Sequence, residues 1–294
     1  MNNLYSWMAE YYAPLVVPLS VILGLLVGSF LNVVIYRVPV MMERGWTLFS
    51  KEHLGIELTD EEKQPFSLTR PPSRCPKCGN RVRPWQNIPV VSYLLLKGKC
   101  GHCHTHISAR YPAVEVLTAV VFGIVATCYG WSWITLTGLV FTGFLVALAF
   151  IDADTQYLPD ELTIPLVWLG LLAAYGGSGL VSLQQSVMGA VCGYLSLWLL
   201  NWLHKRIRGI DGMGGGDFKL LAALGAWLGA AVLPVVVFVA AVVGIVAALI
   251  MKVRQSQPMA FGPCLIIAGW IVFVTHDKVL AGVRWWLHMS GFSA

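Results

Sequence analysis

The segment Gly212-Met213-Gly214-Gly215-Gly216-Asp217-Phe218-Lys219 stands directly before the apolar run 220–251, which contains no charged residue. A run of this length can enter a membrane. Glycine lets a backbone turn, or approach another chain, where a side chain would not fit. A carboxylate at the edge of a bilayer costs free energy and usually has a function. The segment therefore predicts a membrane protein with Asp217 at the lipid–water boundary, where a second carboxylate can share its role.

The composition agrees with a membrane protein. Apolar residues make up 57% of the 294 positions and charged residues only 12%, whereas a soluble domain has about 25% charged residues. The apolar residues form long charge-free runs, so we expect an all-α polytopic integral membrane protein in contact with lipid. Of the 20 Lys and Arg residues, 12 lie between Arg37 and Arg110. This bias is typical of a cytoplasmic loop, and we expect no nucleic-acid partner.

The charge-free runs predict about eight transmembrane helices. The segment before the first run has no Lys or Arg, unlike a secretory signal, so the first helix is expected to be retained. The run 116–151 would rise about 54 Å as one helix, against a hydrocarbon core of about 30 Å. It therefore predicts two helices. The other expected spans are one at 11–36, two in each of 162–204 and 220–251, and one at 263–275.

The charged loops of this arrangement fall on one side and the uncharged turns on the other. The positive-inside rule makes the charged side cytoplasmic, so both termini are expected to be periplasmic. The predicted domains are a first transmembrane helix at 1–36, a cytoplasmic loop domain at 37–111 and a seven-helix membrane domain at 112–294.

The predicted cytoplasmic loop carries four cysteines with the spacing C-x2-C-x21-C-x2-C: Cys75, Cys78, Cys100 and Cys103. Two such pairs can close a tetrahedral thiolate site, for which structural zinc is the usual metal. Iron–sulfur ligation and redox thiols are the alternatives. A site with four protein ligands has no open position, so we expect zinc to stabilise a loop that is too polar to build its own core.

Two carboxylates are expected at membrane depth on the cytoplasmic face. Asp152 directly follows the apolar segment FTGFLVALAFI, and Asp217 precedes the apolar run described above. A pair of close carboxylates cannot easily lose both protons, so the pair holds one proton between them. That arrangement supports aspartic-protease chemistry. The two residues lie on different predicted helices, so their contact is a tertiary prediction.

The residues around this pair have expected roles of their own. Asp160 follows Pro159 and precedes an apolar run, a setting suited to a helix N-cap. Lys219 either orients substrate or extends its ammonium group to the interface. Glu115 is expected to form an interfacial ion pair near Arg110. Gly214 and Gly216 are expected to let the chain pass close to a substrate backbone or a neighbouring helix; these two glycines and Lys219 are the predicted supporting residues.

These segments together resemble a known family. The chain is similar to the type IV prepilin peptidases, bacterial inner-membrane aspartic proteases that share a G-x-G-D motif with presenilin-like enzymes. The resemblance covers nearly the whole chain. It rests on Gly28-Ser29-Phe30-Leu31-Asn32-Val33, the four cysteines, Pro84-Trp85-Gln86-Asn87-Ile88-Pro89, Arg110-Tyr111-Pro112, Ile151-Asp152-Ala153-Asp154, Leu158-Pro159-Asp160, the glycine-rich segment and Phe261-Gly262-Pro263.

The resemblance implies that Asp152 and Asp217 are the catalytic pair. It also implies cleavage of the basic leader of type IV prepilins or type II secretion pseudopilins, after a glycine, at the cytoplasmic membrane face. Members with the cysteine loop also methylate the new N-terminal amine with S-adenosylmethionine. No G-x-G-x-x-G segment opens a helix after a strand, so no residue is assigned to the methyl donor.

Two other classes of function remain open at this point. A metal-dependent phosphotransferase would hold magnesium with Asp152, Asp154 and Asp160, but the chain has no spaced D-D-x-x-D repeat. A non-enzymatic assembly protein with a proton relay would place its carboxylates in the middle of helices. The carboxylates of this chain are expected at helix ends.

Overall fold

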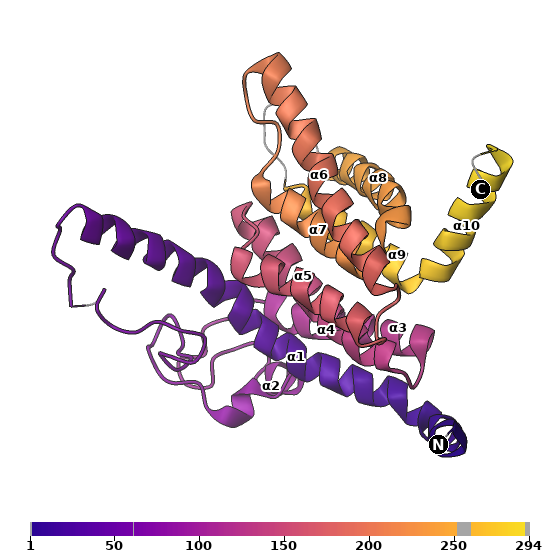
Figure 1. Ribbon diagram of the computed structural model, residues 1–294. Coiled ribbons are helices and arrows are strands. Elements are labelled where there is room, and N and C mark those ends of the chain that lie inside the picture. Colours follow the sequence, from indigo (N-terminus) through magenta and orange to yellow (C-terminus); the bar gives the residue numbers. More distant parts are fainter. Residues whose placement is uncertain (1, 61, 252–259, 292–294) are drawn as a thin grey trace. The chain divides into compact units, whose positions relative to one another are not determined.

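The computed structural model describes residues 2–60, 62–251 and 260–291. Its described elements are helices, with two isolated β-bridges and no named strand (Figure 1). This confirms the predicted all-α fold class. The helices are α1 (Asn2–His53), η1 (Pro84–Asn87), α2 (Val91–Leu95), α3 (Arg110–Tyr129), α4 (Trp133–Thr155), α5 (Asp160–Tyr175), α6 (Leu183–Arg208), α7 (Gly215–Leu228), η2 (Ala230–Val232), α8 (Leu233–Met251), α9 (Gly262–Val274) and α10 (His276–Met289).

Five helical segments in the described ranges are long and apolar enough to cross a membrane. They are the part of α1 from Pro14, then α3, α4, α6 and the segment Ala230–Met251; α9 and α10 form a sixth candidate, bent by 89°. The protein is therefore a multi-pass membrane protein, but the predicted count of about eight spans is not confirmed. Helices α5, α7 and α9 have 16, 14 and 13 residues. They rise about 20–24 Å, less than the hydrocarbon core of about 30 Å.

The chain divides into two compact units, Met1–Gly130 and Trp131–Ala294. The first helix continues beyond the expected end of its span at residue 36 and reaches His53. Arg37 lies within the helix, and its guanidinium donates to the carbonyl oxygens of Ser67 at 2.8 Å and Pro71 at 2.6 Å. The loop after α1 thus folds back onto the part of the helix that continues beyond residue 36.

The first unit is built on a close contact between α1 and α3. A Cβ atom on Gly24 would lie 2.6 Å from the Cα of Ala119, and one on Gly28 would lie 2.7 Å from the Cα of Glu115. These contacts require glycine. The amide of Asn32 on α1 then donates to the carbonyl oxygen of Tyr111 at 3.1 Å, which fixes the start of α3 beside α1.

The second unit packs α7 between α5, α6 and α9. Phe141 of α4 stacks on Trp227 of α7, with 4.7 Å between ring centroids, and lies 5.0 Å from the ring of Phe273 in α9. This aromatic layer is the centre of the unit's core. The chain breaks between α7 and α8 at Gly229, whose φ of 82° is in the region that favours glycine. Pro234 follows as the second residue of α8.

Candidate functional site

Asp152 lies in the last turn of α4. The helix ends at Thr155, because Gln156 adopts a left-handed conformation (φ 55°) and its amide donates to the carbonyl oxygen of Asp152. The Asp152 side chain is 4% exposed, and its Oδ2 atom has no hydrogen-bond partner. A buried carboxyl oxygen without a partner costs free energy. Structural stability does not explain this arrangement, so the group is a candidate for catalysis.

Asp217 lies in the first turn of α7 and is half-buried. The helix begins after Gly214, which occupies the N-cap position with an extended backbone (φ −71°, ψ 144°). Unpaired backbone N–H groups make the N-terminus of a helix partially positive, and this favours a carboxylate there. The glycine-rich segment therefore begins α7 so that Asp217 lies at the N-terminal end of the helix.

The structure brings the chain segments that bear Asp152 and Asp217 close together. The charge of Asp152 acts on Asp217, and the thiol of Cys264 on α9 lies within the electrostatic reach of both. A Cβ atom on Gly262, the first residue of α9, would overlap Oδ2 of Asp152. Glycine is needed there, and the site is formed where α4 ends and where α7 and α9 begin.

Leu158 and an ion pair support this arrangement. A Cβ atom on Gly216 would lie 2.9 Å from Cβ of Leu158, and one on Gly262 would lie 3.2 Å from Cδ1 of the same side chain. Leu158 therefore packs against both glycine-containing segments beside the carboxyl groups. Two residues later, Asp160 accepts from the Lys219 ammonium group at 2.6 and 2.7 Å.

The expectation that Asp160 caps α5 is wrong. Pro159 occupies the N-cap position without a side-chain hydrogen bond, and Asp160 is the first helical residue. Its carboxylate binds Lys219 instead, and this contact joins the first turns of α5 and α7. Asp211 is not part of the site, because it pairs with Lys205 at 2.9 Å. That hydrogen bond also lowers the pKa of Asp211.

The sequence did not identify Leu158, Gly262 or the Asp160–Lys219 pair as a supporting set. Leu158 and Gly262 stand in segments that carry the family resemblance, but nothing local in the sequence shows that they meet. By contrast, Gly214 has no atom within 4 Å of a Cβ built on it. Its own packing does not require glycine, so the open space beside it is available to another chain.

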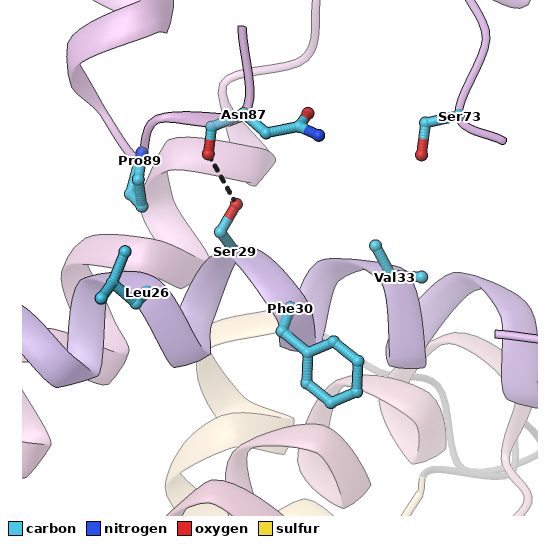
Figure 2. Close-up of a pocket in the computed structure, with 7 residues that line it drawn as sticks. All are labelled: Leu26, Ser29, Phe30, Val33, Ser73, Asn87 and Pro89. Carbon is cyan, nitrogen blue, oxygen red and sulfur yellow. Dashed lines mark hydrogen bonds between the residues drawn. The ribbon is translucent and has the colours of Figure 1, made fainter. Parts of the chain in front are cut away.

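In the first unit, polar side chains of α1 and α3 form hydrogen bonds with the backbone of the loop between these helices. Figure 2 shows Ser29 of α1 pointing toward the loop, where its hydroxyl donates to the carbonyl oxygen of Asn87 at 3.5 Å. The buried carboxylate of Glu115 accepts from the amide of Val90 at 2.7 Å. Glu115 therefore binds the loop backbone, and the ion pair expected near Arg110 stays a prediction. A cavity of about 270 Å³ lies beside Ser29 and is lined by Leu26, Phe30 and Val33 of α1 and by loop residues.

The four cysteines form one cluster. Their Sγ atoms all lie within 4.8 Å of one another, and those of Cys75 and Cys103 are 3.7 Å apart. Four thiolates around a tetrahedral metal with bonds of about 2.3 Å would be about 3.8 Å apart. The described geometry fits a metal ion.

The two cysteine pairs have the same local structure. An antiparallel bridge closes each one, between Arg74 and Arg81 in the first and between Lys99 and His106 in the second. The amides of Cys78 and Lys77 lower the pKa of the Cys75 thiol. Hydrogen bonds with the side chain and the backbone of Thr105 lower the pKa of Cys103 to about 6. Both thiols are thereby favoured in the thiolate form that a metal requires, whereas the pKa of Cys78 is raised to about 11, because burial and the neighbouring thiols outweigh its hydrogen bond with the backbone of Asn80.

Loss of a cysteine ligand should loosen the loop and leave the carboxyl site intact. We expect Cys75→Ser to release the metal, because three ligands hold it less tightly, and to speed limited proteolysis of the loop. Elemental analysis and a protease time course measure both effects. Cys128→Ser, at an exposed position of α3, should change neither. Leader cleavage that falls in proportion to metal content in well-folded protein would contradict a structural role.

The fold and the site define a multi-pass helical membrane protein with two carboxyl groups at neighbouring helix ends. A family model described as "Bacterial Peptidase A24 N-terminal domain" matches residues 22–129, and one described as "Type IV leader peptidase family" matches residues 139–249. The chain belongs to the type IV leader peptidase family.

Curated relatives agree with this assignment over almost the full chain. A protein of Neisseria gonorrhoeae named "Prepilin leader peptidase/N-methyltransferase" is 61% identical, covering 94% of this chain and 96% of its own. Proteins of the same name from Pseudomonas aeruginosa and Dichelobacter nodosus are 47% and 53% identical, covering 93% and 85% of this chain and 94% and 88% of their own. No solved structure matches the chain.

Proposed function

We propose that this protein is a membrane aspartic endopeptidase that removes the leader of type IV prepilins and methylates the new N-terminal amine. Its family membership and the names of its relatives support both activities. The observation that carries the catalytic assignment is the pair formed by Asp152 and Asp217. Type II secretion pseudopilins, which have the same kind of leader, are the second substrate class we propose.

The two carboxyl groups would divide the work of hydrolysis. Because two close carboxylates do not readily lose both protons, one is charged and the other is neutral. The charged group takes a proton from water while the water oxygen attacks the carbonyl carbon of the scissile bond. The neutral group donates its proton to the carbonyl oxygen. As the tetrahedral intermediate breaks its C–N bond, a proton passes to the leaving amine.

The substrate fits a site at the end of membrane helices. A prepilin has a basic leader followed by an apolar helix, so its scissile bond lies where the helix leaves the lipid. We propose that the open space at Gly214 admits the substrate backbone. By the positive-inside rule, the site and the cysteine loop face the cytoplasm of a bacterial inner membrane and both termini face the periplasm.

We propose zinc as the metal of the four-cysteine cluster, because four thiolates in tetrahedral geometry suit zinc and leave no position open for substrate. S-adenosylmethionine is the methyl donor that we propose for the second activity. The cavity beside Ser29 has a volume of about 270 Å³, slightly below the range of about 300–1,000 Å³ typical of small-molecule sites. This cavity is therefore not assigned to the donor.

A prepilin N-terminal peptide tests the proposed function directly. The purified protein in lipid vesicles should release the leader, and mass spectrometry should find one added methyl group on the product when S-adenosylmethionine is present. A chelator of magnesium should leave cleavage unchanged. Cleavage that requires magnesium would favour a metal-dependent mechanism, and folded protein that leaves the peptide uncut would refute the proposal.

We propose that Lys219 is a positioning residue, because its contact with Asp160 fixes the turn of α7 that bears Asp217. Lys219→Met should lower kcat by about 10- to 100-fold with little change in KM, since small displacements of a catalytic group carry such costs. The side chains of Lys219 and Asp160 are 35% and 42% exposed, so the loss of stability should stay below about 1 kcal/mol. Steady-state kinetics and thermal unfolding measure these effects.

Two further variants separate positioning from substrate binding. Lys219→Arg keeps the charge and should retain most of kcat. The exchange Asp160→Lys with Lys219→Asp should recover part of the activity that either single change removes. An increase in KM alone, with normal kcat, would mean that Lys219 binds the substrate directly.

A further inference from the structure

Helices α4, α7 and α9 contact one another at two positions along their axes, which we call two levels. Asp152, Asp217 and Gly262 lie together at one level, and the aromatic layer of Phe141, Trp227 and Phe273 lies at the other. Ten or eleven residues separate the two levels on each helix, which is about 16 Å at 1.5 Å per residue. Because the spacing is nearly the same on all three helices, the aromatic layer lies about 16 Å from the carboxyl pair along the helix axes.

Helix α9 ends one residue beyond this layer, and the chain then turns. Helix α10 leaves it at an angle of 89°, and Figure 1 shows α10 running away from the end of α9. The first residue of α10, His276, is buried, and its Nε2 lies 3.2 Å from the carbonyl oxygen of Leu228 at the end of α7. The start of α10 is therefore anchored at the end of the helical core.

Helix α8 shows where this level lies in the membrane. It has 19 residues, none of them charged, and rises about 28 Å, close to the hydrocarbon thickness of about 30 Å. It begins directly after η2, and η2 contacts α10. Because the length of α8 is nearly the full thickness of the hydrocarbon core of the membrane, the first residue of α8 lies close to one surface of that core. The beginning of α10 is at the same boundary.

Helix α10 is amphipathic, unlike the spanning helices. The helical period of 3.6 residues places Val279, Leu280, Val283, Trp286 and Leu287 on one face. Asp277, Lys278, Ala281, Arg284, Trp285 and His288 fall on the opposite side, so the polar side also carries one Trp. Trp285 and Trp286 are 66% and 60% exposed, while Val283 and Leu287 of the apolar face are only partly exposed. Trp side chains are favoured at membrane interfaces.

We propose that α10 lies flat in the lipid–water interface on the side of the membrane away from the carboxyl pair. Its apolar face enters the boundary of the acyl chains, and Lys278 and Arg284 meet phosphate groups of the lipids. This position has a consequence for the active site. The carboxyl pair is then about 18 Å from that interface, and about 12 Å below the opposite one. The scissile bond, which lies where the substrate helix leaves the lipid, must therefore move inward from that boundary to reach the pair.

Photo-crosslinking from the two faces of α10 tests this position. The photoreactive residue benzoylphenylalanine replaces Val283 in one variant and His288 in another, each in the full chain in vesicles of phosphatidylethanolamine and phosphatidylglycerol. Mass spectrometry of the intact protein counts lipid adducts. We expect severalfold more lipid adducts from position 283 than from position 288. Leader cleavage is measured separately, so the result does not depend on the proposed function.

The other outcomes would overturn the proposal. Equal lipid adducts from both positions would mean that α10 crosses the membrane. Adducts with neither position would mean that α10 stands in water. Crosslinks from position 283 to a second protein chain in place of lipid would mean that the apolar face is a protein interface. A change that merely unfolds the protein is recognised by loss of its thermal transition, and a second pair at Leu287 and Ala281 then decides the question.

Discussion

Replacing Asp217 by Asn is expected to abolish leader cleavage while leaving the protein folded. The amide has nearly the same size as the carboxylate, but it can neither accept a proton from water nor deliver one to the substrate carbonyl. Removal of one member of a catalytic unit usually costs about as much as removal of the whole unit, so a decrease of about 10⁴-fold in kcat is expected. Quenched time courses of leader release, followed by mass spectrometry, measure it.

Asp152→Asn should have the same effect on cleavage and a different effect on stability. The Asp152 carboxyl group is 4% exposed with an unpartnered oxygen, so replacing a group that is costly to bury should leave the thermal midpoint unchanged or raised. Enzymes often carry such destabilising groups at their active sites. The double variant should lose no more activity than either single variant, because both residues act in the same step.

Asp211→Asn is the matched control for these two variants. It makes the same chemical change six positions before Asp217, on a carboxylate that pairs with Lys205 outside the site. We expect normal cleavage from this variant. Full cleavage by Asp152→Asn or by Asp217→Asn would exclude the proposed pair, whatever the control shows.

The sequence predicted the elements of this fold better than their relation to the membrane. Charge-free runs and the turn at Tyr129-Gly130-Trp131 identified α3 and α4, because the period and length of apolar segments are local properties. The number of spans could not be predicted in this way. Helices α7 and α9 are apolar but short. Only the tertiary structure shows that they pack inside the second unit, and that neither is long enough to cross the membrane alone.

The cysteine cluster was also predictable from the sequence. The spacing of two residues within each pair sets the local turn, and the positive φ angles of Gly79 and His104 follow from that turn in the structure. A metal site built from two such turns needs few long-range contacts. The prediction of four ligands is therefore matched by a compact cluster, while the identity of the metal is still a proposal.

The carboxyl site was predictable only in part. Hydropathy placed Asp152 and Asp217 at helix ends, because a charged group interrupts an apolar run. It could not show that Gly262 touches one of them, or that Asp160 binds Lys219 and does not cap its own helix. Those contacts join segments that are far apart in the chain. Packing determines them, and no local pattern reports packing.

Replacing Gly189 by Ala is expected to separate α6 from α7 and to lower both stability and activity. A Cβ atom on Gly189 would overlap the carbonyl oxygen of Gly225, and one on Gly193 would lie 2.5 Å from that of Leu221. The two helices therefore meet backbone to backbone, as small residues spaced four apart allow in membranes. Ser186 also donates to the carbonyl oxygen of Ala226 across this contact.

The added methyl group has two opposite effects. Alanine is favoured over glycine within a helix by about 1 kcal/mol, but overpacking a close contact typically costs about 1–3 kcal/mol. Because the clash at Gly189 is with backbone atoms, which cannot rotate away, the second effect should exceed the first. We expect a lower thermal midpoint in detergent and slower leader cleavage, since any shift of α7 moves Asp217 away from Asp152.

Gly282→Ala separates the two effects. Gly282 lies within α10, and no atom lies within 4 Å of a Cβ built on it. The same substitution there adds helix propensity without a clash, so the thermal midpoint should stay equal or rise, with normal cleavage. If Gly189→Ala also left both quantities unchanged, the backbones of α6 and α7 would have room between them. The close crossing would then not be what holds Asp217 in position.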